Sequence, residues 1–260
     1  MYELIDSGNG RKLEQFGAYR LDRPCGVAVW RPQKEWKATA TFNRDSGWSG
    51  DLPAHWEVEM LGLKLRVGPT PFGHLGLFPE HRSIWEWIDQ HVKGGHFLNL
   101  FGYTGVATLV AARAGAQVCH CDASKPMVEW ARENCRRNGL EGAPVRWIVD
   151  DAYKFLERER KRGRTYETIL LDPPTFGRGS QGEVFKADRD LQDLLEACFA
   201  LQPKTVILSS HTPGWTHQVL SNLLVRTRPG GTQAGGTQGL DLLLGRQFPI
   251  PCGAATIWSR

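Results

Sequence analysis

Two patterns of hydrophobic and polar positions divide the chain. From about residue 83 onward, short apolar runs alternate with longer amphipathic segments. The runs predict strands and the segments predict helices, because apolar residues that recur every three to four positions share one face of a helix. The expected strands are residues 96–100, 117–121, 145–149, 168–171 and 205–208, and the expected helices are residues 83–91, 104–114, 125–138, 152–161 and 185–201. This alternation predicts an α/β fold class, a Rossmann-like doubly wound and mostly parallel sheet.

The first 75 or so residues follow the other pattern. Short extended runs at residues 26–30, 56–60 and 63–67 are bounded by turn-forming residues, which predicts a small β-rich N-terminal module. We therefore expect two domains, the module at residues 1–75 and a larger domain at residues 76–260. Six of the ten tryptophans come before residue 90. Core packing is the favoured interpretation, because alternating strands turn large side chains inward, and a stacking platform for unpaired bases is the alternative.

Capping and turn residues mark the ends of predicted elements. Ser83 is expected to cap the first helix, with Glu86 three residues later completing a capping box. Near the C-terminus, the segment 228–239 repeats Gly-Gly-Thr-Gln, which predicts a loop before closing strands at about 240–244 and 254–258. A plain connection is favoured for this loop over a gate for substrate.

The composition excludes several classes of protein. Of the 260 residues, 41% are hydrophobic and 23% are charged, which is the balance of a soluble globular chain. No apolar stretch approaches the roughly 20 residues of a membrane helix, and the polar first residues resemble neither an export nor an import signal. We therefore expect a cytoplasmic protein without membrane contact. A net charge of +4 tolerates a polyanionic partner without requiring one.

The cysteines predict thiols rather than a metal site. Six cysteines are scattered along the chain, and the Cys-x-Cys pair of Cys119 and Cys121 has no second pair at zinc-finger spacing. Mostly buried, structural cysteines and no metal are the expectation.

Candidate chemistry follows the ends of the predicted strands, where ligands bind in an open parallel sheet. After the first strand, Gly102 and Gly105 permit a tight turn into a helix whose N-terminus favours an anionic group. After the second strand, Asp122 can accept hydrogen bonds from ribose hydroxyls. After the third strand, Asp150 and Asp151 are placed to meet a base. Together these positions predict a cofactor that contains adenosine.

A dinucleotide is the less favoured form of that cofactor. Its fingerprint needs a first glycine where this chain has Leu100, so an NAD-dependent oxidoreductase is disfavoured. The run Asp-Pro-Pro-Thr-Phe at residues 172–176 follows the fourth strand and adds a second, more specific signal.

Four segments together resemble the class I S-adenosylmethionine-dependent methyltransferases. They are Leu-Asn-Leu-Phe-Gly-Tyr-Thr-Gly at residues 98–105, Asp-Ala-Ser at 122–124, Asp-Asp-Ala at 150–152 and Asp-Pro-Pro-Thr-Phe at 172–176. More narrowly, they resemble the bacterial group of large-subunit ribosomal RNA cytosine-C5 and guanine-N7 methyltransferases. The resemblance runs from about residue 72 to residue 210, and the N-terminal module is only loosely similar.

The resemblance implies S-adenosyl-L-methionine as the cofactor. Residues 101–104 would hold its methionine end, Asp122 its ribose, and Asp151 with the Ala152 N–H its adenine, while Phe78 would lie over it as a lid. The full cofactor site implied in this way comprises Phe78, Asn99, Phe101, Gly102, Tyr103, Thr104, Asp122, Ala123, Ser124, Asp151, Ala152 and Asp172.

The catalytic residues implied by the resemblance are Asp172, Pro173, Pro174 and Phe176. The two prolines fix the backbone, so that Asp172 and nearby carbonyls face the acceptor as rigid hydrogen-bond acceptors. Phe176 can stack on a flipped or unpaired base.

The acceptor atom is predicted from a missing nucleophile. Cytosine carbon-5 needs a cysteine thiolate to add to the ring first. In relatives with that chemistry the cysteine follows the fifth strand, where this chain reads Leu-Ser-Ser-His-Thr at residues 208–212. This favours a nitrogen acceptor, which has its own lone pair. His211 is a general-base candidate here, although a loop or capping role is favoured.

We therefore expect a cytoplasmic S-adenosylmethionine-dependent methyltransferase that modifies a nitrogen of an RNA base, in ribosomal RNA, without a cysteine nucleophile. Methylation of a small molecule or a protein is the first alternative. A non-catalytic module that binds S-adenosylmethionine is the second, and the intact run at residues 172–176 counts against it.

Overall fold

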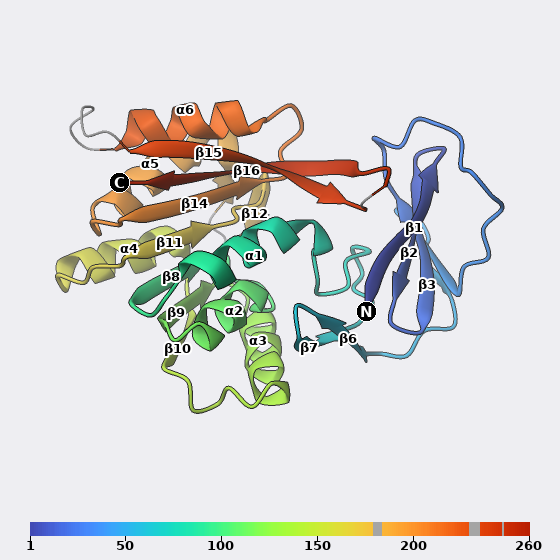
Figure 1. Cartoon of the computed structure of the whole chain (residues 1–260), viewed down its shortest axis with the longest axis horizontal. Coiled ribbons are helices and arrows are strands. Elements are labelled where there is room, and N and C mark those ends of the chain that lie inside the picture. The colour runs from blue at the N-terminus through green and yellow to red at the C-terminus, as the bar shows by residue number, and fades with distance from the viewer. Residues whose placement is uncertain (179–183, 229–234, 246) are drawn as a thin grey trace. The chain divides into compact units, whose positions relative to one another are not determined.

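Internal packing divides the chain into two units (Figure 1). The computed structural model describes residues 1–178, 184–228, 235–245 and 247–260. Unit 1 comprises Met1–His81 with Leu243–Pro251, and unit 2 comprises Arg82–Leu242 with Cys252–Arg260. The division into two domains near residue 75, expected from the sequence, stays a prediction.

Unit 2 is built on a seven-stranded sheet. Its strands are β8 (His96–Leu100), β9 (Gln117–Asp122), β10 (Val145–Val149), β11 (Thr168–Leu171), β14 (Thr205–Ser210), β15 (Gly236–Leu244) and β16 (Ile250–Ser259). The order across the sheet is β10-β9-β8-β11-β14-β16-β15. Strands β10 to β14 of this order run parallel, and β16 runs antiparallel to β14. The order winds outward in both directions from β8, which confirms the predicted Rossmann-like, doubly wound fold.

Six helices complete the described part of unit 2, and they lie in two groups along the sheet (Figure 1). One group packs in sequence as α1 (Arg82–His91), α2 (Val106–Arg113) and α3 (Lys125–Arg137), and the other as α4 (Ala152–Lys161), α5 (Ala187–Phe199) and α6 (His217–Thr227). Strand β8 serves both groups, because alternate side chains point to opposite faces. Leu98 and Leu100 join the buried cluster with α4, α5 and α6, whereas Asn99 bonds to Thr108 of α2.

Unit 1 is rich in β-structure, as the sequence predicts. A five-stranded sheet has the order β1-β2-β3-β4-β5, a separate hairpin joins β6 to β7, and the one-turn helix η1 follows. The bounds are β1 (Tyr2–Gly8), β2 (Arg11–Phe16), β3 (Tyr19–Pro24), β4 (Ala40–Asn43), β5 (Gly47–Gly50), β6 (Trp56–Met60), β7 (Leu63–Val67) and η1 (Pro79–His81).

A buried charge pair lies inside unit 1. Glu14 is fully buried, and its carboxylate meets Arg23 at 2.7 Å and Lys12 at 3.2 Å. Tyr2 donates a further hydrogen bond to Glu14 at 3.0 Å. Burial raises the pKa of Glu14, but the two cations outweigh it and hold that pKa below its usual value.

Three sequence predictions about local structure are wrong. Residues 26–30 form no strand, because turn bonds such as Ala28 N–H to the Cys25 carbonyl, at 3.0 Å, use the groups that a ladder needs. Ser83 does not cap a helix, because α1 already begins at Arg82 and the buried Ser83 hydroxyl has no hydrogen-bond partner among the described residues.

The third error lies before α5. Phe185, expected in a helix, belongs to a hairpin of β12 (Phe176–Arg178) and β13 (Val184–Lys186). The helix begins after Lys186, whose N–H donates to the Asp190 carboxylate at 2.7 Å. The sequence also did not predict α6.

The glycine-rich segment near the C-terminus is only partly described. Residues 229–234 of the predicted loop at 228–239 lie outside the described residues. Residues 236–239 belong to β15, so the first closing strand starts four residues earlier than the sequence predicts. Among the described helices, none combines the length and the apolar character that a membrane crossing needs.

Candidate functional site

The loop between β8 and α2, residues 101–105, is called the glycine loop here. Phe101 and Tyr103 both have positive φ, at 55° and 49°, a conformation that side chains with a Cβ rarely adopt. The Gly102 N–H donates to the Cys121 carbonyl at 3.1 Å, and the Gly105 N–H donates to the Gly102 carbonyl at 3.0 Å. The loop is therefore held in a strained shape by bonds to itself and to the end of β9.

Gly102 is required by its surroundings rather than by its own backbone conformation. A Cβ atom on Gly102 would lie 2.4 Å from Cε1 of His120. A Cβ atom on Gly105 would lie 2.8 Å from the Cβ atom of Ala131 in α3. The two glycines thus let the backbone rest directly on His120 and α3.

Three polar side chains form a buried cluster beneath the glycine loop. The Asn99 amide donates to the Thr108 hydroxyl oxygen at 2.9 Å, and Nδ1 of His120 lies 2.9 Å from the same oxygen. Nε2 of His120 has no hydrogen-bond partner in the described part of the chain. Burial, with a smaller contribution from Arg132, lowers the pKa of His120 to about 3, so the imidazole is neutral at physiological pH.

Asp122 connects the glycine loop to the start of α3. Its carboxylate accepts the Tyr103 N–H at 2.9 Å through one oxygen and the Ser124 N–H at 2.8 Å through the other. Burial raises the pKa of Asp122, and the two N–H bonds act in the opposite direction. A carboxylate has about four acceptor positions, so two remain for hydroxyl groups of a ligand.

Asp151 caps α4 at the next strand end. Its Oδ1 atom accepts the Lys154 N–H at 3.0 Å, and Ala152 is the first residue of the helix. Asp150 is committed elsewhere, because it accepts the Asp151 N–H and forms an ion pair with Arg158. Of the two acids, Asp151 is the better candidate for a ligand at this edge, because only its Oδ1 atom bonds to α4 in the described part of the chain.

Asp172 stands at the end of β11 and is oriented by β14. The buried Ser209 hydroxyl lies 2.7 Å from Oδ1 of Asp172 and 3.2 Å from the Leu171 carbonyl oxygen. Pro173 is buried and Pro174 is exposed. Phe176 begins β12 with 52% of its surface exposed. This run therefore presents one oriented carboxylate, a stiff backbone and an accessible aromatic ring.

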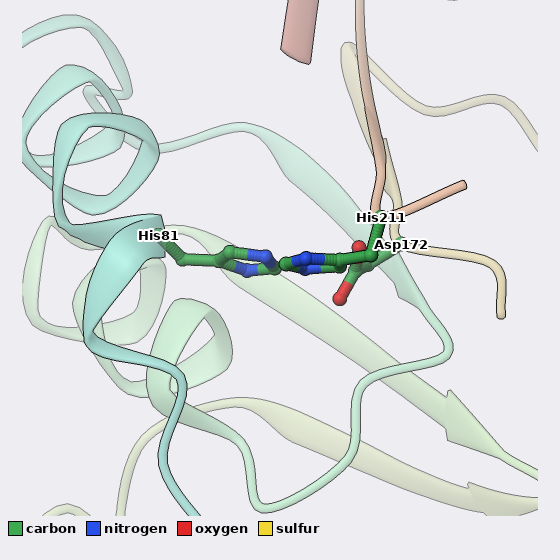
Figure 2. Close-up of side chains that lie close together, drawn as sticks. All are labelled: His81, Asp172 and His211. Carbon is green, nitrogen blue, oxygen red and sulfur yellow. The ribbon is translucent and has the colours of Figure 1, made fainter. Parts of the chain in front are cut away.

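His211, at the end of β14, is the neighbour of Asp172. Figure 2 shows these two side chains, and a ring nitrogen of His211 lies within 4.8 Å of a carboxylate oxygen of Asp172. Nδ1 of His211 is 2.9 Å from the Cys252 carbonyl oxygen, which only accepts. Nδ1 is therefore the donor of this hydrogen bond.

Sequence reasoning missed two side chains of this edge. The Phe185 ring of β13 lies 5.8 Å from the Phe101 ring, centroid to centroid, so the hairpin after Asp172 contacts the glycine loop. His120 is the second. The alternation of β9 places it opposite Cys119 and Cys121, and this signal was available in the sequence.

Phe78 belongs to unit 1, unlike the rest of the predicted site. It is half-buried, and its ring lies 5.2 Å from the ring of His74 and 6.1 Å from that of His81, centroid to centroid. Its predicted role as a lid stays a prediction.

Comparison with known proteins identifies the family. The family model for S-adenosylmethionine-dependent methyltransferases matches residues 10–220. The chain belongs to the S-adenosylmethionine-dependent methyltransferases. A methyltransferase of this kind from Agrobacterium tumefaciens has a crystal structure that is 39% identical, with a TM-score of 0.92 over 99% of this chain and 90% of the other.

Curated relatives add a more specific name. The ribosomal RNA large subunit methyltransferase K/L of Ectopseudomonas mendocina is 37% identical over 75% of this chain, and that of Marinobacter nauticus is 35% identical over 56%. These alignments cover 26% and 20% of the two relatives, so the chain spans about a quarter of their length or less. A tRNA (uracil-54, C5)-methyltransferase of Pyrococcus abyssi shares the fold at 11% identity, with a TM-score of 0.55 over 95% of this chain and 58% of the other.

The family's cofactor is S-adenosylmethionine, as the sequence predicts. The edge described above fits it, because the closely packed glycine loop leaves no room for a Cβ atom and Asp122 retains acceptor positions beside it. The methyltransferase fold thus gathers residues 101–104, Asp122, Asp151 and Asp172 at neighbouring strand ends of unit 2.

The structure bears on the argument that no cysteine nucleophile follows the fifth strand. None of the residues 208–212 is a cysteine, as the sequence shows. However, β16 runs back along β14, and this brings the Cys252 backbone against His211. The backbone of Cys252, in the C-terminal strand, therefore lies close to His211, the residue that follows β14.

Proposed function

We propose that this methyltransferase transfers the methyl group of S-adenosylmethionine to a nitrogen of a base in ribosomal RNA. The names of the curated relatives support the ribosomal RNA acceptor. The single observation that carries catalysis is the oriented Asp172, bonded by Ser209 at 2.7 Å and followed by two prolines. A fixed acceptor at a strand end suits a reaction in which most of the rate comes from positioning.

In this proposal, residues that follow different strands of unit 2 bind different parts of the cofactor. Residues 101–104 hold the amino-acid end of the cofactor at the helix N-terminus, with the Asn99 amide supporting them from beneath through Thr108. Asp122 accepts from the ribose hydroxyls, with Ala123 and Ser124 shaping the turn. Asp151 and the Ala152 N–H meet the adenine. When bound, the cofactor supplies a methyl group on a positively charged sulfur.

The acceptor side consists of Asp172, Pro173, Pro174 and Phe176. The Asp172 carboxylate and the carbonyls beside the prolines accept hydrogen bonds from the edge of the base, which orients the nitrogen lone pair toward the methyl group. Phe176, half of whose surface is exposed, stacks on the face of the base. Because the sulfur leaves as a neutral thioether, the methylated base carries the positive charge or releases a proton.

The test uses methyl-labelled S-adenosylmethionine with RNA and protein fractions from cells lacking the gene. Label in a single N-methylated nucleoside of ribosomal RNA, lost in the Asp172→Ala variant, is the expected result. Asp193→Ala is the matched control, since it removes one exposed carboxylate of α5. Label confined to protein or to small molecules would contradict the RNA acceptor.

A variant of Cys252 distinguishes methylation of a nitrogen from methylation of a carbon. The second candidate function, methylation of a pyrimidine carbon-5, is favoured only by the position of the Cys252 backbone beside His211. A nitrogen acceptor predicts that Cys252→Ser retains full activity. A C5-methyl product together with an inactive Cys252→Ser enzyme would establish the second candidate instead.

A further inference from the structure

A long loop of unit 1 is held in place without forming helix or strand. Residues 25–39 connect β3 to β4, and we call them the tryptophan loop. Loops of about 12 to 15 residues without secondary structure are uncommon in compact domains and often carry function. Here β3 and β4 are parallel neighbours, which need a crossover of about a dozen residues, so the length alone assigns no role to the loop.

Hydrogen bonds fix the backbone of the tryptophan loop. The Asn9 N–H donates to the Trp30 carbonyl at 2.7 Å, and the Trp30 indole N–H donates to the Ser7 carbonyl at 3.0 Å. Oδ2 of Asp6 accepts the Gln33 N–H at 3.0 Å and the Trp36 indole N–H at 2.8 Å. Both tryptophans thus use their polar atoms on the scaffold, and their rings are held rather than left to rotate.

The outer side of the loop carries apolar and cationic groups together. Val29 is 83% exposed, and Trp30, at 41%, is the one exposed tryptophan among those that the structure describes. Arg31, Lys34 and Lys37 are exposed as well, against a single acid in the loop, Glu35. An aromatic ring with cations a few residues away matches the chemistry of unpaired nucleic acid, in which bases alternate with phosphates.

We propose that the tryptophan loop binds single-stranded RNA of the substrate, with a base stacked on Trp30 and phosphates contacted by Arg31 and Lys34. This inference rests on the proposed RNA acceptor. It assigns to unit 1 a binding role that is separate from the cofactor and acceptor residues of unit 2.

The test measures binding of a short mixed-sequence single-stranded oligoribonucleotide to the full-length protein at several salt concentrations. Trp30→Ala is expected to weaken binding roughly 10-fold, which is the usual scale for one base–aromatic stack. Trp30→Phe keeps a ring and loses only the N–H bond to Ser7, so it is expected to bind nearly as well as the wild type.

The charge variant has a matched control. R31Q/K34Q is expected to lower the slope of log affinity against log salt by about 1.4, because each phosphate contact to a single strand contributes about 0.7. K161Q/R164Q removes the same charge from the exposed end of α4 and the turn that follows it, and is expected to leave the slope unchanged. Affinity for S-adenosylmethionine should be the same in all four variants.

Methylation of RNA by the same variants separates this inference from the proposed function. A wild type that methylates RNA, with Trp30→Ala and R31Q/K34Q binding and reacting like it, would overturn the loop proposal alone. Loop-dependent binding by an enzyme that methylates no RNA would support the loop and refute the acceptor. A wild type that neither binds nor methylates RNA would overturn both.

Discussion

Two regions of the molecule bury polar side chains, and they do so with opposite chemistry. Beneath the glycine loop of unit 2, the buried cluster of Asn99, Thr108 and His120 is neutral. In unit 1, Glu14 and Arg23 are both charged and meet at 2.7 Å. Burial favours the neutral form of a single group, whereas a partner of opposite charge restores the charged form of a pair.

The difference in charge between the two buried groups is explained by what lies next to each of them. A protonated imidazole beneath the glycine loop would repel the positive sulfonium of the family's cofactor, and the neutral cluster avoids this. Nothing comparable limits unit 1, where the pair ties β2 to β3 and, through Arg23, to the Gly73 carbonyl at 2.9 Å. Disruption of the two regions should therefore differ in size, in pH dependence and in effect on the cofactor.

The largest effect is expected from breaking the charge pair. Arg23→Ala leaves Glu14 buried without its main partner, which costs about 3–5 kcal/mol in the free energy of unfolding. Urea denaturation measures this loss. Arg82→Ala, which removes an exposed partner of Glu86, is the control and should change little. If both variants lost the same small amount, the pair would not be the anchor of unit 1.

A smaller but more specific effect is expected at the glycine loop. Gly102→Ala forces a Cβ atom against His120, which costs about 1–3 kcal/mol and displaces the residues that we propose to hold the cofactor. Isothermal titration with S-adenosylmethionine should show lost affinity. Gly142→Ala is the control, because a Cβ atom there meets nothing within 4 Å. The double variant G102A/H120A should lose less than the sum of the two single changes, and strict additivity would rule out the contact as the cause.

The neutral cluster should also respond to mild acid. His120 has a pKa of about 3 when folded and about 6.5 when unfolded, so its stabilising contribution is complete above pH 6.5 and declines as the pH falls toward 3. The loss is about 1.4 kcal/mol per pH unit. The pKa of Glu14 is also lowered when folded, so its contribution is lost only at and below about pH 4.5.

Urea denaturation between pH 6.5 and pH 4.5 tests this order. His120→Phe has no titrating ring, and its stability should fall less steeply than that of the wild type in this window. Equal slopes would mean that the imidazole is protonated in the folded protein.

The sequence predicts the parallel part of unit 2 well, because local patterns of apolar and capping residues indicate buried strands and helices. The first four strands, at residues 96–100, 117–121, 145–149 and 168–171, agree with the structure to within one residue. The residues that follow them had to meet at one edge, since parallel strands share their carboxyl ends. Elements specified by tertiary contacts were missed, such as α6 and the β12–β13 hairpin.

The site shows the same division between local and distant information. Asp122 and Asp172 could be placed by the strands that they follow, but their partners Tyr103 and Ser209 could not. Cys252 is the clearest case. It lies 41 residues beyond His211, and only the antiparallel return of β16 brings its carbonyl within 2.9 Å of that ring. The sequence separation therefore concealed that the Cys252 backbone lies beside His211.

The smallest expected effect concerns the contact above the neutral cluster, between Phe185 and Phe101. Phe101 has a strained positive φ, and the Phe185 ring from β13 packs against it. Phe185→Ala should cost about 0.5–1.5 kcal/mol, seen as a several-fold loss of affinity for S-adenosylmethionine. Phe248→Ala, which removes a ring that is 61% exposed in unit 1, is the control and should leave that affinity unchanged. The double variant F101A/F185A decides the cause. If Phe185 acts by holding Phe101, it should have no further effect once Phe101 is gone, whereas an undiminished second loss would mean that β13 reaches the cofactor by another route.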